Sequence, residues 1–389
     1  MSSIAWIWRQ PASFLALLTV LGGTVEAQET IYVPLTRDDG WQVMDAAEAG
    51  FDAEALAALA QDLDDGAYPN VHAVVIERGD GLVFEQYLTG ADQIWGTAIG
   101  TVEFDAETFH DLRSITKSVT SMVLGIALED DFEEALHRPL LSWFPERADE
   151  VDAGLQTITL RHALTMTSGL EWNEMTASYA DHQNDEIQMY YKLDPLDHVL
   201  SKPMREAPGV CWYYNGGLTM LLAAVVQKIT GQPFEDYTNA VLFEPLGIEN
   251  YGWSAPGHWP QGLPSAASGL RLTVRDLAKI GSVMLHDGQW HGEQIVPAAW
   301  VTLSGETIRT DLGAWDGGGT RGYGFQWWTT RADVDGRTIE AVSGVGYGGQ
   351  RLMIVPELEL VVTVFAGNYF GGGSRTTDEV LLRVIEAVD

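Results

Sequence analysis

The sequence is poor in cysteine and in basic residues. Among 389 residues there is one cysteine, Cys211, so disulfide bonds cannot hold this fold together. Lys and Arg number 22 against 55 Asp and Glu, which gives a formal net charge of −33. A field of that sign repels nucleic acid and anionic lipid, and a solvated surface explains it better than an acidic binding patch does. We therefore expect no nucleic-acid partner.

Long hydrophobic runs are missing beyond the N-terminus. The chain opens with one cation, Arg9, followed by an apolar run over 14–21 and by Val25-Glu26-Ala27. This order predicts a signal peptide cleaved after Ala27, with an uncleaved anchor as the alternative. The run is too short to span a bilayer, and no later stretch reaches the roughly 20 residues that a span needs. We expect an exported protein, periplasmic or secreted, without a membrane span after processing.

The remaining chain has the composition of a globular protein. It is 46% hydrophobic and 10% aromatic, enough for a large core in one composite domain or two intimate ones. Periodicity and turn signals predict the following elements: a helix over 51–63, a hairpin of strands 72–78 and 82–88, a mainly helical stretch over 114–288, strands over 324–328, 351–355 and 360–365, and a last helix over 378–388.

Strands at both ends of the chain must share one sheet. We therefore expect an α/β (α+β) fold, with an antiparallel sheet built from both chain ends, flanked by helices, and an inserted mainly helical domain. The sheet domain is placed at 28–115 and 290–389, and the helical domain at 116–289.

Ser114 and Lys117 are the first candidate site. Apolar residues follow at helical spacing, so a helix is expected to start near Ser114, with the Lys117 amine reaching back over its first turn. A serine becomes a good nucleophile when a buried, neutral lysine takes its proton. The non-catalytic alternatives are that Ser114 caps the helix and that Lys117 is an ordinary surface lysine. With 17 serines and five lysines, about 0.2 such pairs are expected by chance.

The second candidate is Tyr213 with Asn215, ahead of a predicted helix over 218–230. A Tyr-x-Asn motif facing Ser114 can relay a proton to the leaving group, while the amide orients substrate and lysine. The same pattern occurs at Tyr68 and Tyr237, so only its position distinguishes it. A packed core tyrosine is the alternative for Tyr213.

The third candidate is the glycine-rich segment 343–350, which contains Gly346, Gly348 and Gly349. A strand follows it instead of a helix, so a dinucleotide-binding loop is not expected. The glycines are better explained as letting an edge strand approach a substrate closely.

Together these motifs resemble the serine β-lactamase and penicillin-binding-protein superfamily, from about Phe51 to the C-terminus. The closest resemblance is to the class C β-lactamase-related branches, family VIII carboxylesterases and 6-aminohexanoate-dimer hydrolases. Further segments that resemble these families are Leu164–Leu170, Leu242–Ile248 and Leu272–Ala278.

The resemblance implies a role for each candidate residue. Ser114 is the acylated nucleophile, Lys117 and Tyr213 are a coupled proton-transfer pair, and Asn215 is an orienting amide. The backbone amides of Ser114 and Tyr347 form the oxyanion hole. No metal or cofactor is implied.

The sequence departs from the superfamily at the third motif. No Lys or His stands between Glu340 and Gln350, where penicillin-recognising members carry a cation for the substrate carboxylate; Arg351 replaces it only if the strand turns it inward. We therefore expect a serine hydrolase of small esters or linear amides. A β-lactamase or D-alanyl-D-alanine peptidase, and a catalytically silent protein binding cell-wall fragments or a partner, are the alternatives.

Other hydrolase classes fit less well. An α/β-hydrolase needs a Gly-x-Ser-x-Gly elbow, which is missing, and a zinc hydrolase needs clustered histidines, whereas the nine in this chain are scattered.

Overall fold

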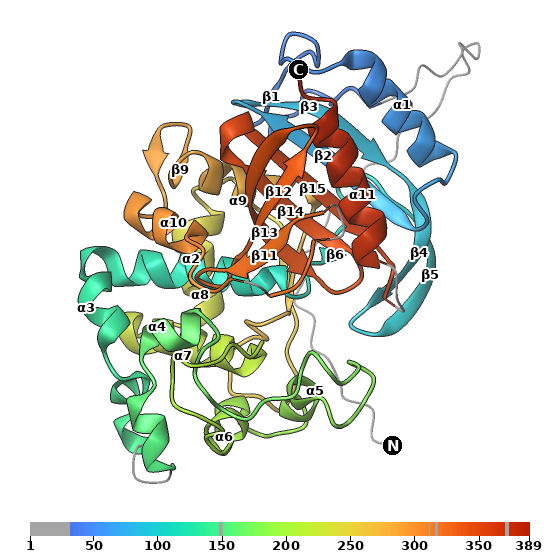
Figure 1. Cartoon of the computed structure of the whole chain (residues 1–389). Coiled ribbons are helices and arrows are strands. Elements are labelled where there is room, and N and C mark those ends of the chain that lie inside the picture. The colour runs from blue at the N-terminus through green and yellow to red at the C-terminus, as the bar shows by residue number, and fades with distance from the viewer. Residues whose placement is uncertain (1–31, 148–150, 311, 316–317, 370–372) are drawn as a thin grey trace.

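An eight-stranded sheet built from both ends of the chain forms the centre of the fold (Figure 1). Its order is β1 (Gln42–Val43), β3 (Gly81–Tyr87), β2 (Val71–Arg78), β15 (Leu360–Ala366), β14 (Gln350–Val355), β13 (Arg337–Gly346), β12 (Trp328–Val334) and β11 (Thr320–Tyr323). All neighbours are antiparallel except β1 and β3. The predicted fold class is confirmed.

The structure is a computed structural model that describes residues 32–147, 151–310, 312–315, 318–369 and 373–389. The predicted signal peptide, residues 1–27, lies outside the described residues. Within these ranges, no helix combines the length and apolar character that crossing a membrane requires.

Two predicted strand segments had different outcomes. The hairpin is confirmed, because β2 and β3 pair with Arg78 opposite Gly81 across a two-residue turn. The strand predicted over 324–328 is wrong for 324–327, which connect β11 to β12, and only Trp328 belongs to a strand. Phe325, Gln326 and Trp327 are all buried in this connection, and Gln326 has a left-handed φ of 64°, which a strand does not allow.

Side chains alternate between the two faces of the sheet, as a strand's geometry requires. Val74 and Ile76 of β2 point into a core with helices α1 (Ala53–Asp64) and α11 (Gly373–Glu386). Ala73 and Val75 point into the other, larger core, which contains α2 (Ile115–Leu128), α7 (Gly216–Thr230), α9 (Val274–Leu285) and α10 (Ala298–Gly305).

Helix α2 joins the sheet to a helical layer, because it packs against β13 and β14 on one side and against α7 on the other. The layer gathers on the far side of α2 from the sheet in Figure 1. Its shorter helices are α3 (Phe132–His137), α4 (Leu160–Leu164), α5 (Asp185–Met189), α6 (Pro195–Leu200) and α8 (Phe234–Thr238). Helix α9 falls inside the predicted helical domain by sequence, yet it packs on β2, β14 and β15.

Three smaller sheets lie beside these layers. They are the hairpin β4 (Thr89–Ile94) and β5 (Thr97–Glu103), the hairpin β9 (Gln289–Trp290) and β10 (Glu293–Gln294), and a sheet of β6 (His110–Asp111), β8 (Leu270–Leu272) and β7 (Gly252–Trp253). Strand β6 leads directly into the turn before α2, so it sets the position of Ser114.

Candidate active site

Ser114 stands at the N-terminus of α2 with its hydroxyl turned to Lys117. It occupies the N-cap position, but its side chain makes no capping hydrogen bond. Instead, the Lys117 Nζ donates to the Ser114 Oγ at 3.1 Å. Arg113, just before it, has a left-handed φ of 50°, a conformation that costs a non-glycine residue on the order of 1 kcal/mol and is often found at functional sites. The capping alternative therefore does not describe this serine.

Lys117 is fully buried, as predicted, because α2 is covered on all sides and every residue from Ile115 to Gly125 is buried. Its Nζ also donates to the Ala267 carbonyl at 3.1 Å and lies 4.8 Å from the centre of the Tyr214 ring. Two buried carboxylates complete its surroundings, with Glu174 Oε1 at 3.7 Å and Glu186 Oε2 at 4.0 Å. The surface-lysine alternative is excluded by this environment.

The tyrosine beside Ser114 is Tyr214 and not the predicted Tyr213. The Tyr214 hydroxyl is hydrogen-bonded to Ser114, and its ring is buried. Burial and the charge of Glu174 raise the pKa of Tyr214 well above its ordinary value, so it stays a neutral phenol. Tyr213 is half-buried and donates to Glu206 Oε1 at 2.6 Å. Consecutive residues of this extended segment point in opposite directions, so a shift of one residue exchanges the two tyrosines.

Asn215 acts as the N-cap of α7. Its Oδ1 accepts a hydrogen bond from the Leu218 amide at 3.1 Å, and its side chain is buried. It is not among the described residues that line the cavity at Ser114. The structure therefore gives Asn215 a local bond at the helix start, one residue after Tyr214.

Glu174 and Glu186 form a buried carboxyl pair behind Lys117. Glu174 accepts hydrogen bonds from Trp172 Nε1 at 2.8 Å, the Gly216 amide at 2.7 Å and the Tyr179 hydroxyl at 3.1 Å. Despite these donors, burial and the charge of Glu186 raise the pKa of Glu174 to about 8.

Glu186 behaves in the opposite way. Burial disfavours its charged form, but Lys117 and hydrogen bonds from Glu174, Ser268 and Tyr190 outweigh burial and lower its pKa. At neutral pH the pair therefore holds one proton and one negative charge beside the Lys117 amine.

The glycine-rich motif lies against the turn that carries Ser114. Strand β13 pairs with β12 only as far as Ser343, so 344–346 form a local edge although β13 lies inside the sheet. A Cβ on Gly346 would lie 2.4 Å from the Leu112 carbonyl oxygen, so glycine is needed for this close approach. Gly348 and Gly349 follow with φ values of 103° and 102°, in the turn to β14. Tyr347, between them and β13, reaches the same cavity as Ser114.

A cavity of about 670 Å³ opens at Ser114. Its wall is rich in aromatic side chains, namely Trp95, Tyr179, Tyr190, Tyr191, Tyr347 and Tyr369. Glu186, Arg113 and His182 supply its charged or titratable groups. Two other hollows, of about 790 and 820 Å³, contain none of the candidate residues, so we assign the site to the smaller cavity.

The cavity wall contains an arginine that the sequence analysis did not single out. Arg351 faces α11, on the opposite side of the sheet, where it is 2% exposed and its Nε donates to Asp378 at 2.9 Å. Arg113 instead lies in the cavity wall, 4.8 Å from the Trp95 ring centre and 5.2 Å from that of Tyr369, and it pairs with Asp111 at 3.1 Å.

The structure brings three of the predicted site elements to one place: Ser114, Lys117 and the turn around Tyr347. The tyrosine beside Ser114 lies one residue after the predicted one, and Glu174 and Glu186 were not predicted. Nothing in the local pattern separates these two acids from the rest of the 55 in the chain.

The fold and the site define a class of protein. A sheet covered by helices on both faces, with a Ser-x-x-Lys pair at the start of a buried helix next to a helical layer, is the arrangement of serine hydrolases built on the β-lactamase fold. A family model described as Beta-lactamase matches residues 56–386, and the chain belongs to this family.

Relatives within the family include amide and ester hydrolases. The chain is 26% identical over 325 residues to a 6-aminohexanoate-dimer hydrolase of Paenarthrobacter ureafaciens. The aligned region covers 79% of this chain and 76% of that hydrolase. It is 34% identical over 154 residues to Esterase EstB of Burkholderia gladioli, and this aligned region covers 38% of this chain and 39% of EstB.

The solved structures agree on the fold. A family VIII carboxylesterase superposes with a TM-score of 0.64, covering 89% of this chain and 98% of its own, at 16% identity. The family model and the two relatives confirm the predicted resemblance to the β-lactamase superfamily, including its 6-aminohexanoate-dimer hydrolases and esterases.

Proposed function

We propose that the protein hydrolyses small esters or linear amides through an acyl-enzyme on Ser114. The observation that carries the proposal is the 3.1 Å contact between the Lys117 amine and the Ser114 hydroxyl, at the mouth of an aromatic cavity. A binding protein without catalysis has no need for a buried lysine directed at a serine, because burying an amine costs free energy.

In the acylation step, the Ser114 Oγ attacks the substrate carbonyl carbon, and its proton passes to the Lys117 amine, which must be unprotonated to accept it. The charge that develops on the carbonyl oxygen is held by the backbone amides of Ser114 and Tyr347. The single charge on the carboxyl pair stabilises the ammonium group that Lys117 becomes.

Tyr214 takes the role that the sequence had given to Tyr213. Its hydroxyl is hydrogen-bonded to Ser114 and stays protonated, so it can relay a proton: it donates its own proton to the leaving alcohol or amine as the carbonyl–heteroatom bond breaks, and it takes up the proton that Lys117 had accepted from Ser114. Deacylation reverses these transfers, with water attacking the acyl carbon and Ser114 regaining its proton.

The substrate class follows from the cavity and from the relatives. Six aromatic side chains favour a mainly apolar acyl or leaving group of modest size. The related 6-aminohexanoate-dimer hydrolase and Esterase EstB support both amides and esters as substrates.

Intact-mass spectrometry tests the proposal. The protein is mixed with p-nitrophenyl butyrate, a linear 6-aminohexanoate amide and a cephalosporin, and quenched in acid. We expect a mass increase of one acyl group with the ester or the amide, and none in Ser114→Ala. The proposal is contradicted if the Ser114→Ala variant turns over these substrates as fast as the wild type. It is also contradicted if the wild type forms no adduct and shows no turnover with any of them.

A further inference from the structure

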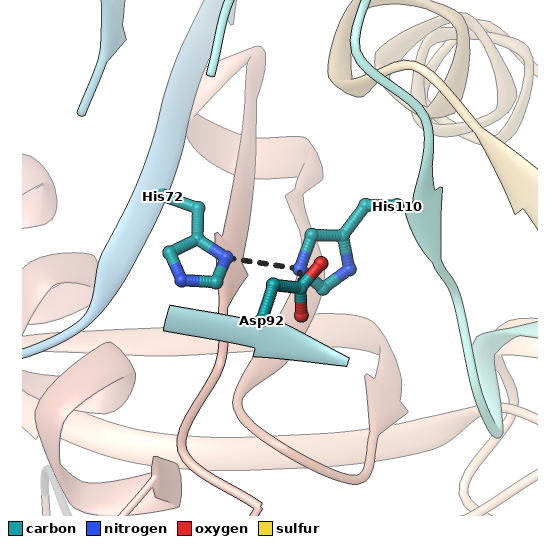
Figure 2. Close-up of side chains that lie close together, drawn as sticks. All are labelled: His72, Asp92 and His110. Carbon is teal, nitrogen blue, oxygen red and sulfur yellow. Dashed lines mark hydrogen bonds and ion pairs between the residues drawn. The ribbon is translucent and has the colours of Figure 1, made fainter. Parts of the chain in front are cut away.

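Two histidines and an aspartate that are far apart in the sequence meet in the interior beside the active-site wall. His72 comes from β2, Asp92 from β4 and His110 from β6, and Figure 2 shows their side chains converging. They are 0%, 6% and 0% exposed. The His72 Nδ1 lies 3.0 Å from the His110 Nε2, which lies 3.6 Å from the Asp92 Oδ1.

The outer nitrogens of both rings face acceptors. The His110 Nδ1 is 3.1 Å from the Asp111 carbonyl oxygen, which can only accept, so this nitrogen carries a hydrogen. The His72 Nε2 is 3.2 Å from the Asn70 Oδ1. The orientation of this amide is fixed, because Asn70 donates to the Ala91 carbonyl at 2.9 Å and accepts from the Ala91 amide at 2.8 Å. His72 therefore donates through Nε2.

This assignment leaves lone pairs on both inner nitrogens. A neutral imidazole carries one hydrogen, so the His72 Nδ1 and the His110 Nε2 both point bare lone pairs at each other, with the Asp92 carboxylate beside them. Three acceptors with no donor between them repel one another, and a cation placed between them removes the conflict. That cation is either an additional proton or a metal ion.

The surroundings favour the metal ion. Phe104 stacks on His72 and Phe365 stacks on His110, with ring centres 4.1 and 4.7 Å apart. Both imidazoles are therefore buried in an apolar setting, which disfavours an additional proton on either ring, whereas a neutral imidazole is the form that binds metals.

The spacing also suits a metal. Tetrahedral ligands with bonds of about 2.0–2.1 Å lie about 3.3 Å apart, and the two measured separations fall on either side of this value. All the candidate ligand atoms lie within 4.8 Å of one another. Metal-binding histidines usually donate their second nitrogen to a carbonyl or carboxylate, as both rings do here.

We infer that His72, Asp92 and His110 bind one divalent transition-metal ion, with Zn²⁺ as the preferred occupant. Two imidazoles and one carboxylate suit Zn²⁺, whereas Ca²⁺ and Mg²⁺ prefer oxygen ligands throughout. This inference is independent of the proposed hydrolysis, in which we expect no metal to take part.

The ion acts as a structural link. The three ligands belong to three different sheets, and His110 stands four residues before Ser114. Asp92 also accepts a hydrogen bond at 3.2 Å from Tyr369, which lines the substrate cavity. A metal here joins the main sheet, the β4–β5 hairpin and the strand that leads into the nucleophile.

Metal titration of the untagged chain tests the inference. The protein is dialysed against EDTA and then into metal-free buffer, and ZnCl2 or CoCl2 is added while binding is followed by calorimetry and, for Co²⁺, by visible absorption. We expect one ion per chain, d–d bands of four-coordinate Co²⁺, and a Tm increase of about 3 °C at a metal concentration 100-fold above Kd.

Variants of the ligands and a matched control localise the ion. Asp92→Asn and His72→Asn should lower metal affinity at least tenfold, whereas His137→Asn, which alters an exposed histidine of α3, should leave it unchanged. The inference is wrong if the wild type shows no stoichiometric binding and no Tm shift, or if folded Asp92→Asn and His72→Asn bind as tightly as the wild type. If neither variant folds, the stoichiometry, the Co²⁺ spectrum and the Tm shift of the wild type decide.

Discussion

Glu174 is the group whose ionisation should slow the enzyme at alkaline pH. With a pKa of about 8, it is mostly protonated at pH 7, while Glu186 is ionised. Raising the pH through 8 adds a second negative charge 3.7 Å from the Lys117 amine. This charge stabilises the ammonium form of Lys117, and a lysine that holds its proton cannot accept one from Ser114.

The size of the effect follows from Coulomb's law. Two unit charges about 4 Å apart interact by about 4 kcal/mol at an effective dielectric constant of 20. Hydrogen bonds from Trp172, Tyr179 and the Gly216 amide spread the charge of Glu174, so less than this acts on Lys117. We expect kcat/KM to fall by one to two decades between about pH 7 and 9.5.

The assay is the pH dependence of kcat/KM for p-nitrophenyl butyrate from about pH 5 to 10, corrected for spontaneous hydrolysis. On the acid side the rate should also fall, because the base that accepts the Ser114 proton must itself be unprotonated. Glu174→Gln should keep the acid limb and lose the alkaline one. The matched control is Glu171→Gln, which alters an exposed acid three residues earlier and should reproduce the wild-type profile.

An alkaline limb that is the same in Glu174→Gln and in the wild type would refute the reasoning. Stability gives a second readout. Because the folded pKa of Glu174 lies above its ordinary value of 4.5, the native state binds more protons between these two values, and its contribution to stability is lost as the pH rises from about 4.5 through 8. Thermal unfolding of Glu174→Gln should therefore depend less on pH in this window.

Four further outcomes are expected. Ser114→Ala should abolish acylation and turnover, and a variant that keeps more than about 1% of wild-type kcat/KM contradicts the nucleophile. Tyr214→Phe should lower kcat by about 10²–10⁴-fold, whereas Tyr213→Phe should change kcat less than threefold. If Tyr213→Phe has the larger effect, the proton-transfer role belongs to Tyr213, as predicted from the sequence. The kcat/KM for nitrocefin should be lower than that for p-nitrophenyl butyrate. A charge-assisted hydrogen bond to a substrate carboxylate is worth about 1.5–3 kcal/mol, and the third motif offers no cation to make one. A tenfold preference for nitrocefin that disappears in Arg113→Gln overturns this expectation. Export with cleavage after Ala27 remains a proposal from the sequence, and the N-terminus of the protein recovered outside the cytoplasm of an expressing bacterium should be Gln28; an intact N-terminus there rejects it.

The sequence by itself determined the features that depend on local contacts. Ser114 and Lys117 meet because they are one helical turn apart, and the apolar spacing of α2 predicts that this helix packs in the interior. The β2–β3 hairpin follows from an Asp-containing glycine turn between two alternating segments. Apolar strands near both ends of the chain required one shared sheet, since neither set can cover its faces alone.

The tertiary structure alone decided which side chains from distant segments meet. Tyr214 replaces Tyr213 because the backbone direction before α7 is set by packing on the helical layer, and a shift of one residue reverses the side chain. Glu174 and Glu186 acquire opposite protonation because burial and Lys117 act on them unequally, and no sequence pattern encodes burial depth. His72 and His110 are 38 residues apart and come from different sheets, so histidines that are scattered along the chain became neighbours only when those sheets packed together.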